Sequence, residues 1–537
     1  MPEQYESKVL DQLGLVSGMC DELEIAETID SIIEQDRDKR IVSIGQAVKA
    51  MILNGLGFVN HQLYLVPHFY RNKPTQRLIG GGIEPEHLND DTLGRALDDL
   101  YEYGVSEAYS LVTARAMKKL ELDMGMGHLD STSFHVDGKY NSEDGAEEGV
   151  VHITQGYSRD HRPDLNQVVL GLMVENQSGI PVLMKPLNGN SSDKTEFGVI
   201  IKEHITQLKE NRGLEYLVAD SALYTEANIQ LLDGAKWISR VPETIKEARQ
   251  VIESADVKSM EIMDEHYRYK TLGSGYGGVP QRWLVVHSTH AALRGVQTVN
   301  KKISKESEKE LRGFEELTRK EFACEPDAIK ALSYYEKGVQ YTGVSSFSIE
   351  KHARYDSAGR PKKGSTPDRM VYRISGALAT SLEERQVQLD RKGCFIIATN
   401  ELDEKKLPPE RLLEGYKGQS KVEKGFRFLK DPDFLASSLY LKSPERIMAL
   451  LMVMTLCLLV YSALEYRIRK ELQEKNQTFP DQKGKPTPRP TAKWVFQEFV
   501  GIHLLKIAGI QEVILNLNDA HRLILNLLGE RYGAFYS

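Results

Sequence analysis

The chain has 537 residues and a mass of 60.7 kDa, enough for about three or four domains at roughly 150 residues each. Hydrophobic residues make up 41% of it and charged residues 27%, which excludes a wholly disordered or collagen-like chain. With 69 Lys and Arg against 77 Asp and Glu, the net charge is −8, which excludes a uniformly basic surface. Any contact with nucleic acid must therefore come from local basic patches.

Cysteine spacing and hydropathy point to a cytoplasmic protein. The four cysteines are far apart and form no short zinc or redox motif, and such sparse cysteines suit a reducing compartment. The one apolar run to consider for a membrane, 448–464, has 17 residues and contains Thr455 and Ser462. Because a span needs about 20 predominantly apolar residues, we expect a buried core helix at this run and no contact with a membrane.

The first 120 residues have a helical and acidic pattern. Apolar residues recur at helical spacing over 41–56, and a second stripe over 93–100 follows capping candidates at 90–92. Core packing is the simplest role for both stripes. We expect a helical N-terminal domain that binds DNA ends, although residues 1–60 hold 11 Asp and Glu against 5 Lys and Arg, which fits that role poorly.

Strand and helix patterns alternate from about residue 126. In chain order they are strands over 128–136, 167–174 and 180–186, a helix over 195–209, a strand ending at Asp220, a helix over 226–232 and a strand over 237–241. The second and third strands read as a hairpin. This order predicts an α/β core with an antiparallel start and a crossover helix.

Residues 243–400 do not continue that order, because a charged helix over 301–321 stands among isolated strand-like runs. A structureless loop of that length inside a domain is implausible, so we expect one α/β core interrupted by an insertion domain. The predicted divisions are 1–122 (helical N-terminal domain), 123–242 (core, first part), 243–400 (α+β insertion domain), 401–473 (core, second part) and 474–537 (a linker at 484–490, then a helical segment with a role in oligomerisation).

Three carboxylates stand where an α/β sheet places its chemistry. Asp130 lies in the first strand, Asp220 ends the fourth, and Glu423 lies on a helix after the insertion. Converging carboxylates repel one another unless hard cations neutralise them. Two Mg²⁺ ions about 4 Å apart could activate a water or a DNA 3′-hydroxyl and stabilise the leaving oxygen. Taken singly, either aspartate is more simply a strand-end or turn carboxylate.

Polar side chains flank Glu423 at spacings of 3, 4, 4 and 3, which places them along one helix face. They are Tyr416, Gln419, Glu423, Arg427 and Lys430. The apolar residues Val422, Phe426 and Leu429 fall on the opposite side, towards a core. A carboxylate beside a phenol and cations suits a metal ligand with phosphate-binding groups next to it. The plain alternative is an amphipathic helix with a solvated face.

The motif Tyr416–x2–Gln419–x3–Glu423–x6–Lys430 resembles the Y-R-E-K signature of the bacterial insertion-sequence transposases related to those of the Tn-five and Tn-ten elements. Five further segments extend the resemblance over roughly residues 30–470. The surroundings of both aspartates (128–132 and 218–221) and the loop 189–195 are similar to that clan, and 45–57 and 88–98 are similar to the opening domain of the insertion-sequence 1634 group.

The resemblance implies a ribonuclease H-like catalytic core, split by an insertion domain before the helix that carries the glutamate, with helical N-terminal and C-terminal domains. It implies that Asp130, Asp220 and Glu423 are the catalytic ligands of two Mg²⁺ ions, for which Mn²⁺ can substitute. The family works as a dimer or higher assembly on two inverted-repeat ends. We therefore expect a nucleoid-associated homodimer on double-stranded DNA.

The resemblance also implies DNA contacts beside the carboxylates. Tyr416 and Lys430 would contact phosphates near the transposon end. Gln419 falls where the family has an arginine and lacks its charge, which Arg427 could supply one turn after Glu423. The side chains of Trp237 and Trp283 could stack on a flipped base, as insertion-domain aromatics can in relatives, although core packing is the simpler role for both.

A local basic patch supports a DNA partner. Residues 351–373 hold seven Lys and Arg against two Asp, and Arg360, Lys362 and Lys363 read as an exposed loop that contacts phosphates. A charge run is more often only a solvated loop. The leading hypothesis is a DNA transposase that binds terminal inverted repeats, cleaves at the element ends and joins them to target DNA. Alternatives are a metal-dependent nuclease without strand joining and a non-catalytic DNA-binding descendant.

Overall fold

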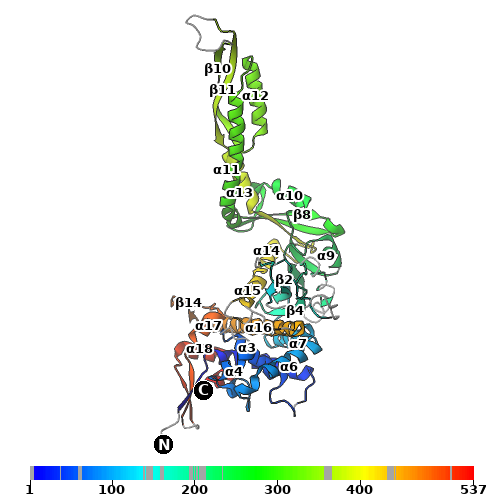
Figure 1. Cartoon of the computed structure of the whole chain (residues 1–537), viewed down its shortest axis with the longest axis vertical. Helices are drawn as coiled ribbons and strands as arrows, with labels where there is room; N and C mark the ends of the chain where they lie inside the picture. The colour runs from blue at the N-terminus through cyan, green and yellow to red at the C-terminus, as the bar shows by residue number, and fades with distance from the viewer. Residues whose placement is uncertain are drawn as a thin grey trace. The chain divides into compact units, whose positions relative to one another are not determined.

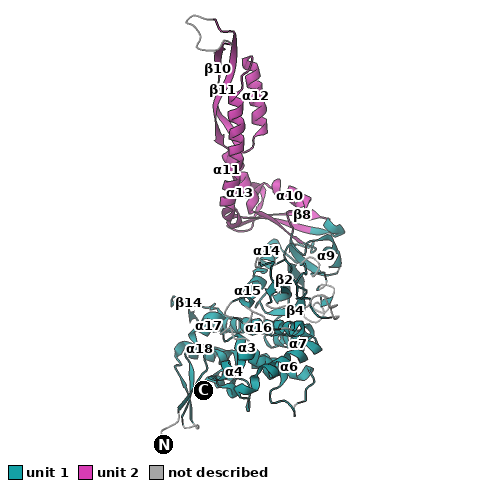
Figure 2. Cartoon of the chain, in the orientation of Figure 1, with its two compact units in different colours: residues 1–240, 275–281, 399–537 teal, residues 241–274, 282–398 magenta. Residues whose placement is uncertain are grey.

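The protein forms two compact units in a computed structural model (Figures 1 and 2). Unit 1 comprises Met1–Arg240, Gly275–Gln281 and Thr399–Ser537, and unit 2 comprises Val241–Ser274 and Arg282–Ala398. The five predicted domains stay a prediction. The structure describes residues 5–36, 38–58, 63–136, 140, 149–157, 162–192, 197–198, 200, 203–204, 213–232, 234–355, 366–431, 434, 441, 443–507 and 511–537. The predicted helix over 195–209 lies largely outside them.

Five strands of unit 1 lie side by side in the order β4-β3-β2-β5-β6, as part of a mixed sheet. β2 pairs with β3 and β3 with β4 in antiparallel fashion, whereas β2 and β6 both pair in parallel with β5. Every residue of β3 and β5 is buried, as expected for strands covered on both faces. The strands are β2 (Met126–His135), β3 (Gln167–Glu175), β4 (Pro181–Leu187), β5 (Tyr216–Ala219) and β6 (Lys236–Arg240). The predicted strands and hairpin of this region are confirmed.

The longest apolar helix, α16 (Pro444–Glu474), contacts α1, α3, α6, α7, α18 and β4 within unit 1 (Figure 1). Its length and composition would suffice to cross a membrane, yet 89% of its most apolar stretch is buried inside the structure. The predicted core helix is therefore confirmed. The other helices of unit 1 are α1 (Leu13–Glu22), α2 (Ile25–Ile32), α3 (Ile44–Gly55), α4 (Val66–Tyr70), α5 (Thr75–Leu78), α6 (Asp90–Tyr103), α7 (Val105–Lys119), α9 (Glu226–Leu231), α14 (Pro409–Lys417), α15 (Ser420–Leu429), α17 (Ala492–Glu498), α18 (Asp519–Leu528) and α19 (Glu530–Gly533).

The two ends of the chain pair with each other. β1 (Tyr5–Val9) pairs with β15 (His503–Ile507), which pairs with β16 (Gln511–Leu515). The predicted linker and helical segment at the C-terminus are wrong in part, because this hairpin and the short pair β13 (Phe479–Pro480) and β14 (Pro486–Thr487) lie there. Strand partners almost 500 residues away leave no local signal in the sequence.

Helix starts also differ from the prediction. The amide of Thr92 donates to the side chain of Asn89 at 2.9 Å, so Asn89 caps α6 one residue before the predicted candidates. Helix α3 matches its predicted apolar stripe, except that Ile41 lies before the helix and is 66% exposed.

Unit 2 contains a hairpin, β10 with β11, that packs against α11 and α12 (Figure 1). Its core joins residues of both helices and β11: Phe314, Leu317, Ala328, Leu332 and Ile374. Four further strands of this unit lie side by side in the order β12-β9-β8-β7. The elements are α10 (Lys246–Glu253), α11 (Thr289–Arg319), α12 (Glu325–Gly338), α13 (Leu382–Gly393), β7 (Glu261–Ile262), β8 (Tyr267–Ser274), β9 (Gln281–Ser288), β10 (Thr342–Arg354), β11 (Arg369–Thr380) and β12 (Cys394–Thr399).

The structure corrects two predictions, one for a helix of unit 2 and one for two tryptophans. The charged helix predicted over 301–321 begins twelve residues earlier, at Thr289, where Ser288 caps it. Trp237 and Trp283 are 0% and 1% exposed, so both pack in cores and neither presents its ring for base stacking.

Candidate active site

The register of two parallel strands places Asp130 beside Asp220. Leu129 of β2 pairs with Ala219, the last residue of β5, so each aspartate follows the same rung of the sheet. The carboxyl ends of parallel strands are where open α/β sheets place ligands. Two acidic residues 90 positions apart in the sequence are thereby brought to one edge of the sheet.

Local hydrogen bonds orient both aspartates. The Oδ1 of Asp130 accepts from the amide of Ser131 at 2.8 Å. The Oδ1 of Asp220 accepts from the amide of Ala222 at 2.9 Å, a turn that lets Asp220 end the strand. The carbonyl of Asp220 accepts from the hydroxyl of Ser239 on β6 at 2.8 Å, which ties this turn to the neighbouring strand.

The polar motif over 416–430 lies on two helices, α14 and α15, and the predicted single helix face is wrong. The turn between the helices approaches the sheet very closely. A Cβ atom at Gly418 would lie 2.5 Å from Asn176 Oδ1 and 2.6 Å from the Cε1 of His128. A turn that needs glycine against a buried ring is a tertiary contact, which residue spacing alone cannot reveal.

A pocket of about 740 Å³ joins the three predicted carboxylates. It is lined by Asp130, Thr132, Asp220, Gln419, Glu423, Phe426, Arg427, Lys430 and Asp431. Six of the predicted site residues in the described part of the chain therefore line the same pocket: Asp130, Asp220, Gln419, Glu423, Arg427 and Lys430. Glu423 lies in the first turn of α15, where a carboxylate is favoured by the helix dipole.

Tyr416 lies beside this pocket and is linked to a residue that the sequence analysis missed. Burial raises the pKa of its hydroxyl, and the charges of Asp220 and Glu423 raise it further, whereas a hydrogen bond and the positive charge of Arg240 oppose them. Arg240 is exposed and ends β6, next to the strand end that carries Asp220. Its position at the end of a predicted strand was the signal in the sequence, because the carboxyl ends of parallel strands are where open sheets bind ligands.

The cations of α15 and its neighbours are held in different ways. The ammonium of Lys430 lies 5.7 Å from the ring centre of Phe134, a cation–π distance, while Lys430 also lines the pocket. Asp431, a fourth carboxylate of the lining, forms an ion pair with Lys493 at 2.8 Å. Asp431 is thus neutralised by a cation from outside the pocket lining.

The donor set of the pocket suits a hard divalent cation. Carboxylate oxygens are the ligands that Mg²⁺ and Mn²⁺ prefer. Within the described ranges, however, no group of three or more His, Cys, Asp or Glu side chains stands close enough to hold an ion. Like charges in a shared site repel one another, and a divalent cation would neutralise them. The three carboxylates therefore suit a cation in their chemistry, but their oxygen atoms must come closer together to bind one ion jointly.

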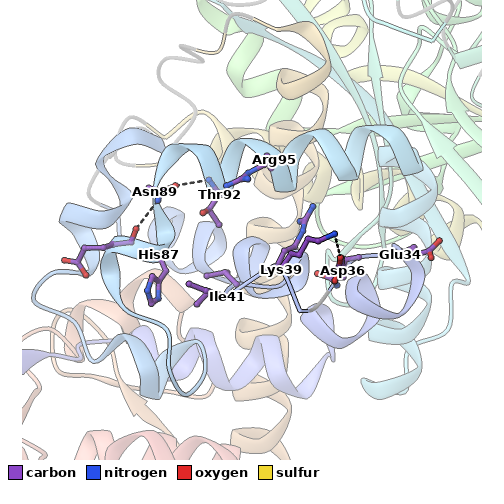
Figure 3. Close-up of a pocket in the computed structure, with 12 residues that line it drawn as sticks. Glu34, Asp36, Lys39, Ile41, His87, Asn89, Thr92 and Arg95 are labelled. Carbon is purple, nitrogen blue, oxygen red and sulfur yellow. Dashed lines mark hydrogen bonds and ion pairs between the residues drawn. The ribbon is translucent and has the colours of Figure 1, made fainter.

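Arg360, Lys362 and Lys363 lie outside the described residues. A separate pocket of about 490 Å³ opens beside the start of α6 (Figure 3). Two of its cations are paired with carboxylates, Lys39 with Asp36 at 2.8 Å and Arg40 with Asp99 at 2.7 Å. Cations neutralised in this way do not favour phosphate binding there.

Comparisons with known proteins identify the family of the chain. The family described as "Transposase DDE domain" matches residues 124–460, and a domain of unknown function, DUF4277, matches residues 5–114. A search of curated proteins found no match. A similar solved structure is the "Cryo-EM structure of piggyBac transposase synaptic complex with hairpin DNA (SNHP)", at 10% identity, 92% coverage of this chain, 81% of that chain and a TM-score of 0.37, too low to carry an argument. Since the first match spans more than half of the chain, this protein belongs to the DDE transposase family, whose members cleave and transfer DNA.

Proposed function

We propose that this DNA transposase binds the terminal inverted repeats of an insertion sequence, cleaves at the element ends and joins them to target DNA. The observation that carries the proposal is the shared pocket, in which Asp130, Asp220 and Glu423 meet the cations Arg427 and Lys430. Acidic groups that can hold divalent cations, with basic groups for phosphates beside them, are what phosphoryl transfer requires. The insertion-sequence 1634 group stays the predicted subgroup.

The five strands of unit 1 support a ribonuclease H-like core. They lie in the order β4-β3-β2-β5-β6, with antiparallel pairs first and parallel pairs after β2, and Asp130 is on β2 while Asp220 directly follows β5. We propose that Glu423 on α15 completes this core after the insertion. The assembly would work as a homodimer on DNA in the cytoplasm.

In the proposed reaction, Asp130, Asp220 and Glu423 would hold two Mg²⁺ ions, for which Mn²⁺ can substitute. When bound, these ions would activate the attacking oxygen and stabilise the leaving oxygen of a phosphodiester. Arg427 and Lys430 bind and orient the DNA backbone as point charges on the pocket lining. Tyr416 holds Arg240 near the acidic groups, where its guanidinium is placed to contact a further phosphate.

Cleavage of terminal-repeat DNA in Mg²⁺ tests this assignment. Asp130→Asn and Glu423→Gln should each abolish cleavage, because each removes an anionic ligand and keeps the side-chain size. Asp431→Asn is the matched control, since this carboxylate lines the same pocket but is paired with Lys493, and it should retain cleavage. Full cleavage by Asp130→Asn would refute the proposal. A joined product with added target DNA separates a transposase from a nuclease.

A further inference from the structure

Gln419 departs from the family pattern, and its surroundings indicate a role other than DNA contact. Its side chain is 7% exposed, and its amide Nε2 donates to the backbone carbonyl of Leu129 at 2.9 Å. A DNA phosphate is reached by side chains whose polar heads face solvent, as on exposed Arg427. The amide of Gln419 faces the sheet instead.

The carbonyl that Gln419 binds lies at the point where the acidic groups converge. Leu129 is the last residue of β2 that pairs with β5, and its partner is Ala219. Asp130 follows Leu129 and Asp220 follows Ala219 along the chain. The hydrogen bond from Gln419 therefore contacts the residue pair that sets the spacing of the two aspartates.

The other end of this hydrogen bond is the start of α15. Gln419 is the N-cap residue of α15, and its own carbonyl accepts from the amide of Glu423 at 3.5 Å. Residues four apart lie one above the other on a helix, so Glu423 stands one turn above Gln419. The position of Gln419 against β2 thus determines how far the Glu423 carboxylate lies from the aspartates.

The packing around Gln419 leaves this turn little freedom. Gly418 lies against His128 and Asn176 at distances that no larger residue allows. His128 is fully buried and shares a 2.9 Å hydrogen bond with Asn176. Lys421, on the first turn of α15, donates to the same Asn176 oxygen at 3.5 Å. The helix start is therefore held at several points, and of these residues Gln419 also lines the pocket with the carboxylates.

We propose that Gln419 is a positioning residue that sets the distance between Glu423 and the two aspartates, and that it does not contact DNA. The inference rests on the proposed function, because it concerns the same carboxylates. In this proposal, other cations supply the positive charge of the family's arginine, and Gln419 acts through the backbone of β2. The variant Gln419→Met keeps the side-chain length and removes the donor, so it isolates the hydrogen bond.

Binding of Mn²⁺ to the DNA-free protein, followed by electron paramagnetic resonance, measures positioning without activity. Gln419→Met should weaken Mn²⁺ binding about tenfold, as loss of a group that orients ligands does. The exposed control Gln473→Met on α16 should bind as the wild type does. Unchanged Mn²⁺ affinity in Gln419→Met would overturn the positioning role alone, whereas a wild type that neither binds Mn²⁺ nor cleaves DNA would overturn the proposed function with it.

The salt dependence of DNA binding, measured without divalent ions, separates positioning from phosphate contact. Loss of one phosphate contact lowers the slope of log affinity against log salt by about 0.9. We expect that drop for Lys430→Gln and an unchanged slope for Gln419→Met. Gln419→Arg should not steepen the slope, since residue 419 faces the sheet, and a steeper slope would overturn the proposal. This second variant decides alone if Gln419→Met fails to fold.

Discussion

Gly418→Ala should destabilise unit 1, although alanine is normally the better residue in a helical backbone. Gly418 has φ −56° and ψ −19°, so alanine should gain about 1 kcal/mol from propensity. Its Cβ atom would however meet Asn176 Oδ1 at 2.5 Å and two atoms of the His128 ring at 2.6 Å. Overpacking of this kind costs about 1–3 kcal/mol. Because the His128 ring is fully buried and cannot move aside into solvent, we expect about 3 kcal/mol. The net loss of unfolding free energy should be about 2 kcal/mol.

Urea unfolding followed by tryptophan fluorescence measures this loss, because Trp237 is buried in the same sheet. The matched control is Gly125→Ala, just before β2, where an added Cβ meets nothing within 4 Å and the change should stay within about 0.5 kcal/mol. DNA cleavage should fall with Gly418→Ala, since α15 carries Glu423. If Gly418→Ala instead stabilises the protein by about 1 kcal/mol, the close contact with His128 does not exist.

Three further outcomes test the surroundings of the site. Burial lowers the pKa of His128 from 6.5 to about 4; the charge of Lys421 lowers it further, and the hydrogen bonds of His128 oppose both. As the pH falls from 6.5 to 4, the unfolded chain binds the proton before the folded one does, so the free energy of unfolding should fall over this range. About 2 kcal/mol should be lost by pH 5, and His128→Gln should flatten that part of a pH series of urea melts. Lys430→Gln should weaken DNA binding alike for specific and random sequences, as a gel-shift titration would show. Leu456→Ala, at a fully buried position of α16, should cost about 2–5 kcal/mol in thermal or urea unfolding, and the same change on a surface helix would cost far less.

Local patterns predicted much of the fold that carries the site. The apolar runs of β2, β3, β4, β5 and β6 were found at their correct places because buried strands produce short apolar stretches bounded by turns. The apolar run 448–464 was predicted to be core because it is shorter than a membrane span, and burial confirms this even though the whole of α16 is long enough to cross a membrane. The positions of the carboxylates on these elements follow directly from the same patterns.

Contacts between distant segments could not be predicted in the same way. The pairing of β1 with β15 joins opposite ends of the chain, and nothing in either segment names its partner. The break between α14 and α15 comes from the approach of Gly418 to the sheet, while the residue spacing over 416–430 fits one helix equally well. Arg240 was missed because a single arginine at a strand end is common, and only the neighbouring strand gives it meaning.

The carboxylates are placed in two different ways, and this difference indicates which of them can move. Asp130 and Asp220 are fixed by the parallel register of β2 and β5, since a slip of one residue would turn their side chains to the other face of the sheet. Glu423 depends only on how α15 packs, through the Gln419 hydrogen bond and the Gly418 contact. Because carboxylates that share a site repel one another, Glu423 should stay back from the two aspartates until cations bind. The start of α15 is held by its contacts with β2 and Asn176, so the exposed Glu423 side chain is the ligand expected to move when cations bind.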